Sequence, residues 1–267
     1  MRVRHLNCGT MTPLGGRLVD GRPGLLRRAT LVCHCLLLES DTGLVLIETG
    51  MGTPAVTEPE RWLGRRFLTL SRPVSRPDET AVSQLRALGH DPADVRDIVL
   101  THLDLDHAGG LVDFPQARVH VYAAELAAYR AGNKRYRSVQ FAHGPQWIEH
   151  TDTGDDWFGF SAAQEILPDV ALIPLAGHTL GHAGVAVNTD TGWLLNAGDA
   201  YFSHSEIDTP GSIPPGLALF ERLVQTVPEQ RVHNQQRLRE LRRTGDVTIF
   251  AAHDLTDFEL LSRPAHA

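Results

Sequence analysis

Metal-ligand side chains follow the predicted strands of this chain at four separate places. The densest run is THLDLDHAGG at 101–110, which directly follows the predicted buried strand 97–101. This run offers four candidate ligands: His102, Asp104, Asp106 and His107. The predicted strands 170–175, 193–197 and 247–251 are followed by three more: His178, Asp199 and His253. Because strand ends can meet at one edge of a sheet, the pattern predicts a fold that gathers these residues into one metal centre.

The spacing within the run 101–110 favours two neighbouring ions. In an extended segment, residues two apart share a face, so His102 and Asp104 can bind one ion together. Asp106 and His107 are adjacent and point away from that pair, which suits a second ion. A lone histidine after a strand is usually a surface or hydrogen-bonded residue. Four such segments in this order favour a metal site instead.

Strands and helices alternate along the chain, which predicts an α/β or α+β fold in a single domain, residues 1–267. The other expected elements are a β-hairpin at 31–38 and 44–47, strands at 119–122 and 183–188, and helices at 80–89, 123–130, 215–226 and 230–243. Two segments are expected to be irregular loops that shape a pocket: the proline- and arginine-rich residues 53–78 and the aromatic residues 132–165.

Composition and motifs exclude several classes of function. Lysine and arginine number 25 against 32 aspartates and glutamates, and the formal net charge of −7 argues against nucleic-acid binding. No apolar stretch is long enough to span a bilayer and no signal peptide is visible, so we expect a cytoplasmic protein without a membrane role. Neither a Gly-x-Ser-x-Gly motif nor a nucleotide-binding glycine motif occurs. Cys33 and Cys35 are interpreted as core residues of a strand.

Five motifs resemble those of the metallo-β-lactamase-fold superfamily of binuclear metallohydrolases. They are LIETGM at 46–51, the run at 101–110, GHTLGH at 177–182, GD at 198–199 and AH at 252–253. The resemblance covers essentially the whole chain and implies a four-layer αβ/βα sandwich. Within the superfamily, the chain is most similar to the N-acyl-homoserine-lactone hydrolases. The signals for that branch are a Cys-x-Leu-Leu strand, the Asp-His-Ala-Gly-Gly run and the closing His253-Asp254.

The resemblance also implies how the candidate ligands divide between two divalent metal ions, which in this family are usually zinc. One ion would be held by His102, Asp104 and His178, the other by Asp106, His107 and His253, with Asp199 bridging the two. Glu48 would orient a ligand histidine through its ring N–H. His182 would support the site without binding an ion.

The sequence departs from the family pattern at three positions. Asp104 stands where the family usually has histidine, and this harder, anionic ligand favours manganese or iron relative to zinc. Glu48 replaces the usual aspartate and is one methylene longer. Lactonases of this branch carry a tyrosine three residues after the bridging aspartate, where this chain has Phe202, with Tyr201 one residue earlier.

The resemblance implies a binuclear hydrolase that opens a small-molecule lactone or carboxylic ester by attack of a metal-bound hydroxide. Asp106 is expected to relay a proton to the leaving oxygen, and Tyr201 is a second catalytic candidate. Trp157 and Phe158 suit an acyl chain and His204 a substrate contact, although ordinary packing or surface exposure explains these three equally well. The alternative functions are a thioester hydrolase resembling glyoxalase II, a phosphodiesterase or nuclease, and a non-catalytic metal-binding scaffold.

Overall fold

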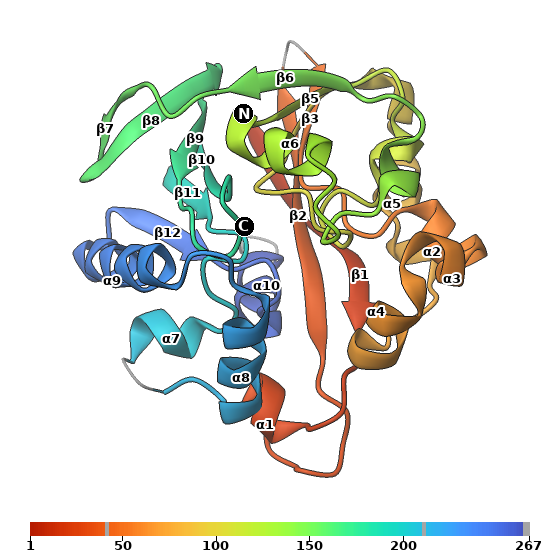
Figure 1. Cartoon of the computed structure of the whole chain (residues 1–267). Helices are drawn as coiled ribbons and strands as arrows, with labels where there is room; N and C mark the ends of the chain where they lie inside the picture. Colours follow the sequence, from red (N-terminus) through yellow and green to blue (C-terminus); the bar gives the residue numbers. More distant parts are fainter. Residues whose placement is uncertain (41–42, 210–211, 264–267) are drawn as a thin grey trace.

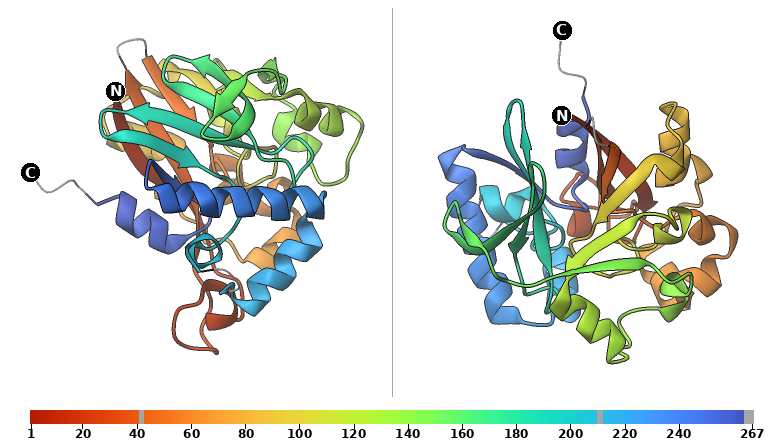
Figure 2. Two further views of the ribbon diagram at one scale, coloured as in Figure 1. Left: turned by 90° about the vertical axis from the view of Figure 1, so that its left-hand side faces the viewer. Right: turned by 90° about the horizontal axis from the view of Figure 1, so that it is seen from above.

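Two six-stranded sheets form the centre of the structure, a computed structural model that describes residues 1–40, 43–209 and 212–263. The first sheet has the order β1 (Arg2–Met11), β2 (Leu31–Ser40), β3 (Gly43–Ile47), β4 (Val95–Val99), β5 (Arg118–Tyr122) and β6 (Gln146–His150). The second has the order β12 (Val247–Phe250), β11 (Gly192–Asn196), β10 (Ala183–Thr189), β9 (Val170–Pro174), β8 (Phe160–Leu167) and β7 (Asp155–Trp157). The two sheets lie side by side in Figure 1 and, seen from above, in Figure 2.

The alternation of side chains along β2 explains why both faces of the first sheet are covered. Leu36 and Leu38 point into the core between the two sheets, where they meet residues of the second sheet such as Val185. Cys35 and Leu37 point the other way, into the core beneath the helices. A strand that is buried on both faces needs a continuous apolar run rather than an alternating one, and β2 has that run.

Helices cover the outer face of each sheet and complete four layers. α5 (Ala81–Ala87) and α6 (Ala123–Arg130) contribute Leu85 and Leu126 to the core outside the first sheet. α9 (Pro228–Thr244) contributes Leu238 and Leu241 to the core outside the second sheet, and Figure 2 shows it along that face. The remaining α-helices include α1 (Arg17–Asp20), α7 (His204–Asp208), α8 (Pro215–Val224) and α10 (Leu255–Leu261). The predicted αβ/βα sandwich is confirmed.

Most predicted elements are present, with ends shifted by no more than two residues. The hairpin predicted at 31–38 and 44–47 is the antiparallel pair β2–β3, whose connecting residues 41–42 lie outside the described residues. The strand predicted at 97–101 ends earlier, because β4 stops at Val99. None of the helices in the described part of the chain is long and apolar enough to cross a membrane.

The interpretation of residues 53–78 as an irregular loop is wrong. They form α2 (Thr53–Thr57), α3 (Pro59–Trp62) and α4 (Gly64–Ser71), followed by a 3-10 turn that begins at Pro77. The prolines that suggested a loop lie in the first turn of α2 and α3. Proline is favoured there because the first helical N–H groups have no partner within the helix.

The interpretation of residues 132–165 as an irregular loop is also wrong. This segment holds a 3-10 turn (Ser138–Phe141), β6, β7 and the start of β8. β6 lies at the edge of the first sheet and is mostly solvent-exposed, so its sequence QWIEH lacks the apolar run of a buried strand. β7 and β8 are joined at Phe158 and Gly159, which both have positive φ.

Candidate metal centre

The strand ends that carry the candidate ligands meet between the two sheets. β3 and β4 are parallel neighbours, so Glu48 after β3 lies beside the run that follows β4. β9 and β11 are both antiparallel to β10, and β12 is parallel to β11. The ends of β9, β11 and β12 therefore point the same way, and they are followed by His178, Asp199 and His253. All seven predicted ligands come together.

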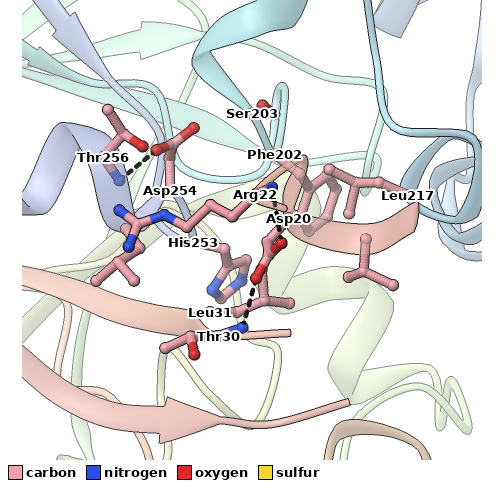
Figure 3. Close-up of a pocket in the computed structure, with 12 residues that line it drawn as sticks. Asp20, Arg22, Thr30, Leu31, Phe202, Ser203, Leu217, His253, Asp254 and Thr256 are labelled. Atoms are coloured by element: carbon pink, nitrogen blue, oxygen red, sulfur yellow. Dashed lines mark hydrogen bonds between the residues drawn. The ribbon is translucent and has the colours of Figure 1, made fainter. Parts of the chain in front are cut away.

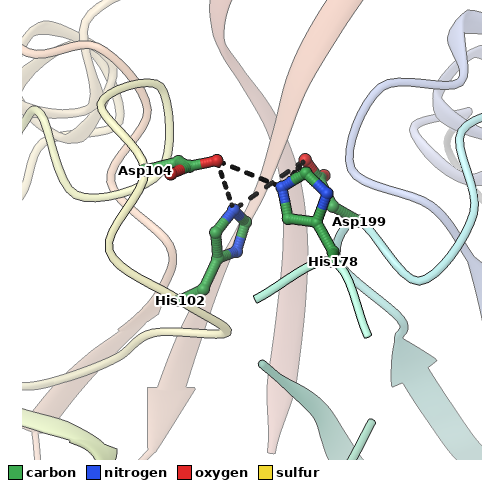
Figure 4. Close-up of side chains that lie close together, drawn as sticks. All are labelled: His102, Asp104, His178 and Asp199. Carbon is green, nitrogen blue, oxygen red and sulfur yellow. Dashed lines mark hydrogen bonds and ion pairs between the residues drawn. The ribbon is translucent and has the colours of Figure 1, made fainter. Parts of the chain in front are cut away.

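The first group of ligand atoms is shown in Figure 4. Its members are His102, Asp104, His178 and Asp199, whose ligand atoms lie within 4.8 Å of one another. Asp104 Oδ2 is 3.3 Å from His102 Nε2 and 3.1 Å from His178 Nε2. Asp199 Oδ2 faces the same two nitrogens at 3.8 and 3.2 Å. Four atoms that each bind one ion at about 2.1 Å lie about 3.4 Å apart in a tetrahedral arrangement, so these separations suit one ion.

The second group lies on the other oxygen of Asp199. Asp199 Oδ1 is 3.3 Å from His107 Nε2 and 3.2 Å from His253 Nε2. Asp106 Oδ2 is 3.6 Å from His253 Nε2. Cys33, which the sequence placed only in the core, has its Sγ within 4.8 Å of ligand atoms of Asp106 and His253. Asp199 thus presents one oxygen to each group.

The orientation of the histidine rings tests whether these residues fit metal ions. Three rings are held at Nδ1 from behind: His102 by Thr101 Oγ1 at 2.9 Å, His107 by Glu48 Oε2 at 2.7 Å and His253 by the Val32 carbonyl at 2.7 Å. Their Nε2 atoms consequently face Asp199. Within the described ranges, His102 Nε2 and Asp199 Oδ1 are buried without a hydrogen-bond partner, which is rare for buried polar atoms. This set of nitrogen and oxygen atoms fits divalent cations.

Glu48 and His182 lie where the resemblance places supporting residues. Glu48 Oε1 accepts a hydrogen bond from the Thr101 N–H, while its other oxygen faces His107. His182 Nε2 accepts a hydrogen bond from the Asp199 N–H at 2.9 Å, and its Nδ1 donates to the Leu175 carbonyl at 3.1 Å. Both ring nitrogens of His182 are therefore engaged, and the ring fixes the backbone of Asp199 rather than offering a lone pair to an ion.

The sequence analysis missed Glu125, a fully buried residue of α6. Its Oε1 accepts hydrogen bonds from the Leu103 N–H and the Tyr136 hydroxyl, and its Oε2 from the Thr179 hydroxyl and the Gly181 N–H. Because two of these donors directly follow His102 and His178, one carboxylate fixes both loops of the first group. The local sequence AAELAAYR gives no signal for this role, since most of the partners lie far away along the chain.

The sequence analysis also missed Arg135, which forms a bidentate ion pair with Asp104. Arg135 Nε lies 2.6 Å from Asp104 Oδ1, and Nη2 lies 2.5 Å from Oδ2. Nη2 is also 2.6 Å from His178 Nε2, and Nη1 donates to the Val224 carbonyl at 2.5 Å. Burial by itself raises the pKa of Asp104, but the charge of Arg135 helps to hold that pKa well below its usual value. The preference for manganese or iron was predicted from the negative charge of Asp104, and this guanidinium offsets that charge.

Tyr201 lies in the core rather than beside the candidate ligands, which corrects its assignment as a catalytic candidate. Its side chain is fully buried in the same cluster as Leu238 of α9, and its hydroxyl has no hydrogen-bond partner in the described part of the chain. Phe202 faces the centre instead. Its ring is stacked on His253 with the centroids 5.5 Å apart and meets the edge of His178 at 5.7 Å. Outside a helix, neighbouring side chains point in different directions. Tyr201 therefore enters the core, whereas Phe202, one residue later, faces the metal centre.

Tyr201→Phe is therefore expected to leave hydrolysis within about twofold of wild type. Removing a buried hydroxyl that lacks a partner also removes its desolvation cost, so the free energy of unfolding should be unchanged or rise by up to about 1 kcal/mol. Steady-state kinetics and urea denaturation measure the two quantities. A tenfold or larger loss of activity in a folded variant is the result that would restore a catalytic role to Tyr201.

Trp157 and Phe158 lie at the opposite end of the second sheet from the ligands. Trp157 of β7 packs against Trp193 at the start of β11, with ring centroids 5.5 Å apart, whereas Asp199 follows the end of β11. The strand residues from Trp193 to Asn196 alone span roughly 10 Å. Phe158 packs against Trp157 and is 44% exposed. The structure favours ordinary packing for both side chains.

His204 lies next to the segment that carries His253. Its Nδ1 is 2.7 Å from Asp254 Oδ2, and this hydrogen bond raises the pKa of His204. The pocket in Figure 3 lies alongside and is lined by Phe202, Ser203, His253 and Asp254, among others. A substrate contact by His204 stays a prediction.

The helices that replace the expected loop 53–78 line a different cavity. It has a volume of about 330 Å³, and its wall includes Ala55, Leu63 and Leu68 together with Cys8 and Met51. None of the seven candidate ligands lines it. The expectation that residues 53–78 shape the pocket at the metal centre therefore has no support from this cavity.

The fold and this centre define a class of protein, and the chain belongs to the metallo-beta-lactamase superfamily, whose family model matches residues 28–253. A probable metallo-hydrolase of Mycobacterium tuberculosis is 40% identical over 270 residues, which cover 97% of this chain and 82% of the relative. An N-acyl homoserine lactonase of Bacillus thuringiensis is 27% identical over 234 residues, which cover 87% of this chain and 84% of the relative. The chain is accordingly a metal-dependent hydrolase.

Solved structures of lactonases have the same fold. An N-acyl homoserine lactone hydrolase with the product N-hexanoyl-L-homoserine at its catalytic metal center matches with a TM-score of 0.73 and 22% identity, covering 98% of this chain and 96% of that one. A dizinc quorum-quenching lactonase matches with a TM-score of 0.65 and 16% identity, covering 94% and 86%.

Proposed function

We propose that this hydrolase uses two divalent metal ions to open a lactone or to cleave a carboxylic ester. The observation that carries the proposal is Asp199, whose two oxygens face two separate pairs of histidine nitrogens. Such an arrangement suits two neighbouring ions that share one ligand. The similarity to proteins named as N-acyl homoserine lactonases supports a lactone as the substrate.

Bound metal ions supply Lewis acidity toward water and toward a carbonyl oxygen. Burial by itself raises the pKa of Asp199, but the charges of His253, His107 and His178 hold it well below its usual range, so this carboxylate stays ionised. Asp106 is proposed to hold the proton that the leaving oxygen receives. The ring of Phe202 covers one face of His253 and keeps water from that side. Unlike a tyrosine, this ring has no hydroxyl to donate to the substrate carbonyl.

The charges around the centre favour an uncharged carbonyl substrate over a phosphodiester. Among the residues that the structure describes, Arg135 is the one arginine or lysine in an ion pair with a candidate ligand. Its guanidinium is already bound to Asp104 and to the Val224 carbonyl. Arg22, which lines the pocket beside His253, is likewise paired with Glu259, so neither guanidinium is free to balance the charge of a phosphodiester in the transition state.

The metal is proposed to be zinc, as in the relative described as a dizinc lactonase, or manganese or iron if Asp104 acts as the selector. Mass-spectrometric metal analysis of protein from media supplemented equally with all three metals decides between them. Purified protein carrying the metal found is then compared on a lactone, an aryl ester, a thioester and an aryl phosphodiester.

We expect the kcat/KM for the lactone to exceed that for the phosphodiester by at least about tenfold, or about 1.4 kcal/mol of transition-state stabilisation. Asp199→Ala serves as the inactive control, since it detects hydrolysis by contaminating enzymes. A higher kcat/KM for the thioester or the phosphodiester, in protein that holds two ions, would contradict the proposed substrate class.

A further inference from the structure

The guanidinium of Arg135 lies against two ligand atoms of the first group. Nη2 is 2.5 Å from Asp104 Oδ2 and 2.6 Å from His178 Nε2. The same two atoms are only 3.1 Å apart and would both have to bind an ion at this group. A positively charged N–H donor therefore engages the lone pairs that the ion requires.

Arg135 and an ion compete at His178 for a simple chemical reason. A neutral imidazole nitrogen has one lone pair in the plane of the ring, and this lone pair either accepts a hydrogen bond or binds a metal. The guanidinium also carries the same sign of charge as the ion. Binding at the first group thus requires Nη2 to move away from His178 and from one oxygen of Asp104.

The surroundings of Arg135 resist that movement. Nη1 donates to the Val224 carbonyl at the end of α8, and Nε is held by Asp104 Oδ1. The backbone N–H of Arg135 donates to the Asn133 side chain at 3.0 Å. The guanidinium is therefore fixed by contacts on several sides, and bidentate pairs of this kind are the strong ones.

The second group has no such competitor. The ion pairs of Asp106, His107 and His253 in the described part of the chain are formed with carboxylates or histidines only. An ion can reach His107 and His253 without displacing a protein cation. The two groups share Asp199, yet among the described residues only the first has a guanidinium bound to its ligand atoms.

We propose that Arg135 makes the two metal sites unequal, acting as a built-in cation that weakens ion binding at the His102, Asp104 and His178 group. The inference rests on the proposed binuclear function. It also gives Asp104 a role beyond metal choice, because the Asp104–Arg135 pair is neutral overall, as an uncharged histidine at position 104 would be. Arg135 is a positioning residue here, since it acts through Asp104 and His178.

The test compares wild type with Arg135→Gln and Arg135→Lys. Metal-free protein is titrated with Zn²⁺ and, separately, with Mn²⁺ by calorimetry, and metal content is measured after dialysis against a weak chelator. Arg130→Gln is the matched control, because it removes an arginine of the same region whose exposed ion pair with Glu149 lies on the surface. Circular dichroism confirms that each variant is folded.

We expect wild type and the control to bind one ion tightly and a second ion weakly. Arg135→Gln should bind the second ion on the order of 10- to 100-fold more tightly, which is the range over which neighbours of ligands change metal affinity. The affinity of Arg135→Lys for the second ion should lie between those of wild type and Arg135→Gln, because an ammonium group cannot hold both oxygens of Asp104. If Arg135→Gln does not fold, the lysine variant alone decides whether the affinity for the second ion rises when the guanidinium is removed.

Two equal affinities in wild type would overturn this inference and leave the binuclear function intact. A second ion that binds no more tightly in Arg135→Gln and Arg135→Lys than in wild type would overturn it as well. Failure of wild type to bind two ions at any concentration would instead overturn the proposed function, and the inference with it.

Discussion

Asp199→Ala is expected to lose both metal ions, whereas His253→Ala should lose only one. Each oxygen of Asp199 faces a different group, so removing the carboxylate takes a ligand from both. His253 belongs to the second group alone, and its Nε2 lies near Asp106 and Asp199. Hydrolysis should fall at least about a thousandfold in both variants, or about 4 kcal/mol of transition-state stabilisation.

Metal content per chain separates this explanation from simple unfolding. Asp190→Ala is the matched control, because that aspartate has an 86% exposed side chain and forms a long ion pair with the N-terminus. It should keep both ions and full activity. Full metal content in Asp199→Ala would refute a shared bridging ligand, and equal loss in the two variants would show that the two sites are not separable.

Glu125→Ala is expected to lower the free energy of unfolding by about 3–5 kcal/mol. The change leaves four donors without their acceptor: the N–H groups of Leu103 and Gly181 and the hydroxyls of Tyr136 and Thr179. Each buried donor that loses its partner costs about 1–3 kcal/mol, and the cavity allows some of them to find water. Because the two loops carry His102 and His178, the first group should also lose its ion.

Glu125→Gln provides the graded comparison, since its amide oxygen still accepts hydrogen bonds while its NH₂ group faces a donor. It should be destabilised by only about 1–2 kcal/mol. Glu149→Ala on β6 is the control, because that carboxylate pairs on the surface with Arg130. Urea denaturation gives the free energies. Wild-type stability in Glu125→Ala would mean that the loops are held by other contacts.

The candidate ligands could be predicted from the sequence because each follows a strand, and strand ends converge in a sandwich of this kind. The run 102–107 needed only the local spacing of ligand types. The strands that carry the ligands could be recognised from their buried apolar residues, which form a continuous run in β9. The ligand spacing and the apolar strands both depend on residues that are close in sequence, and the folded chain contains the elements that they predict.

Glu125 and Arg135 could not be predicted, because their roles depend on partners that meet only in the folded chain. Arg135 is one of three basic residues in the segment NKRYR, and nothing local distinguishes it from its neighbours. Tyr201 was misplaced for a different reason. Tyr201 and Phe202 are adjacent, and one enters the core while the other faces the centre. After a strand ends, no periodic pattern in the sequence predicts which of two neighbouring side chains points which way.

The ligands are divided between the two sheets, since the run 102–107 follows a strand of the first sheet and the rest follow strands of the second. His107 and His253 stand 146 positions apart in sequence. In an unfolded chain such ligands are rarely near one another, so the ions can bind tightly only after the sheets have docked. Bound metal therefore acts as a reversible cross-link between two halves of the chain. Metal supply would govern how long the folded molecule persists as well as how fast it reacts.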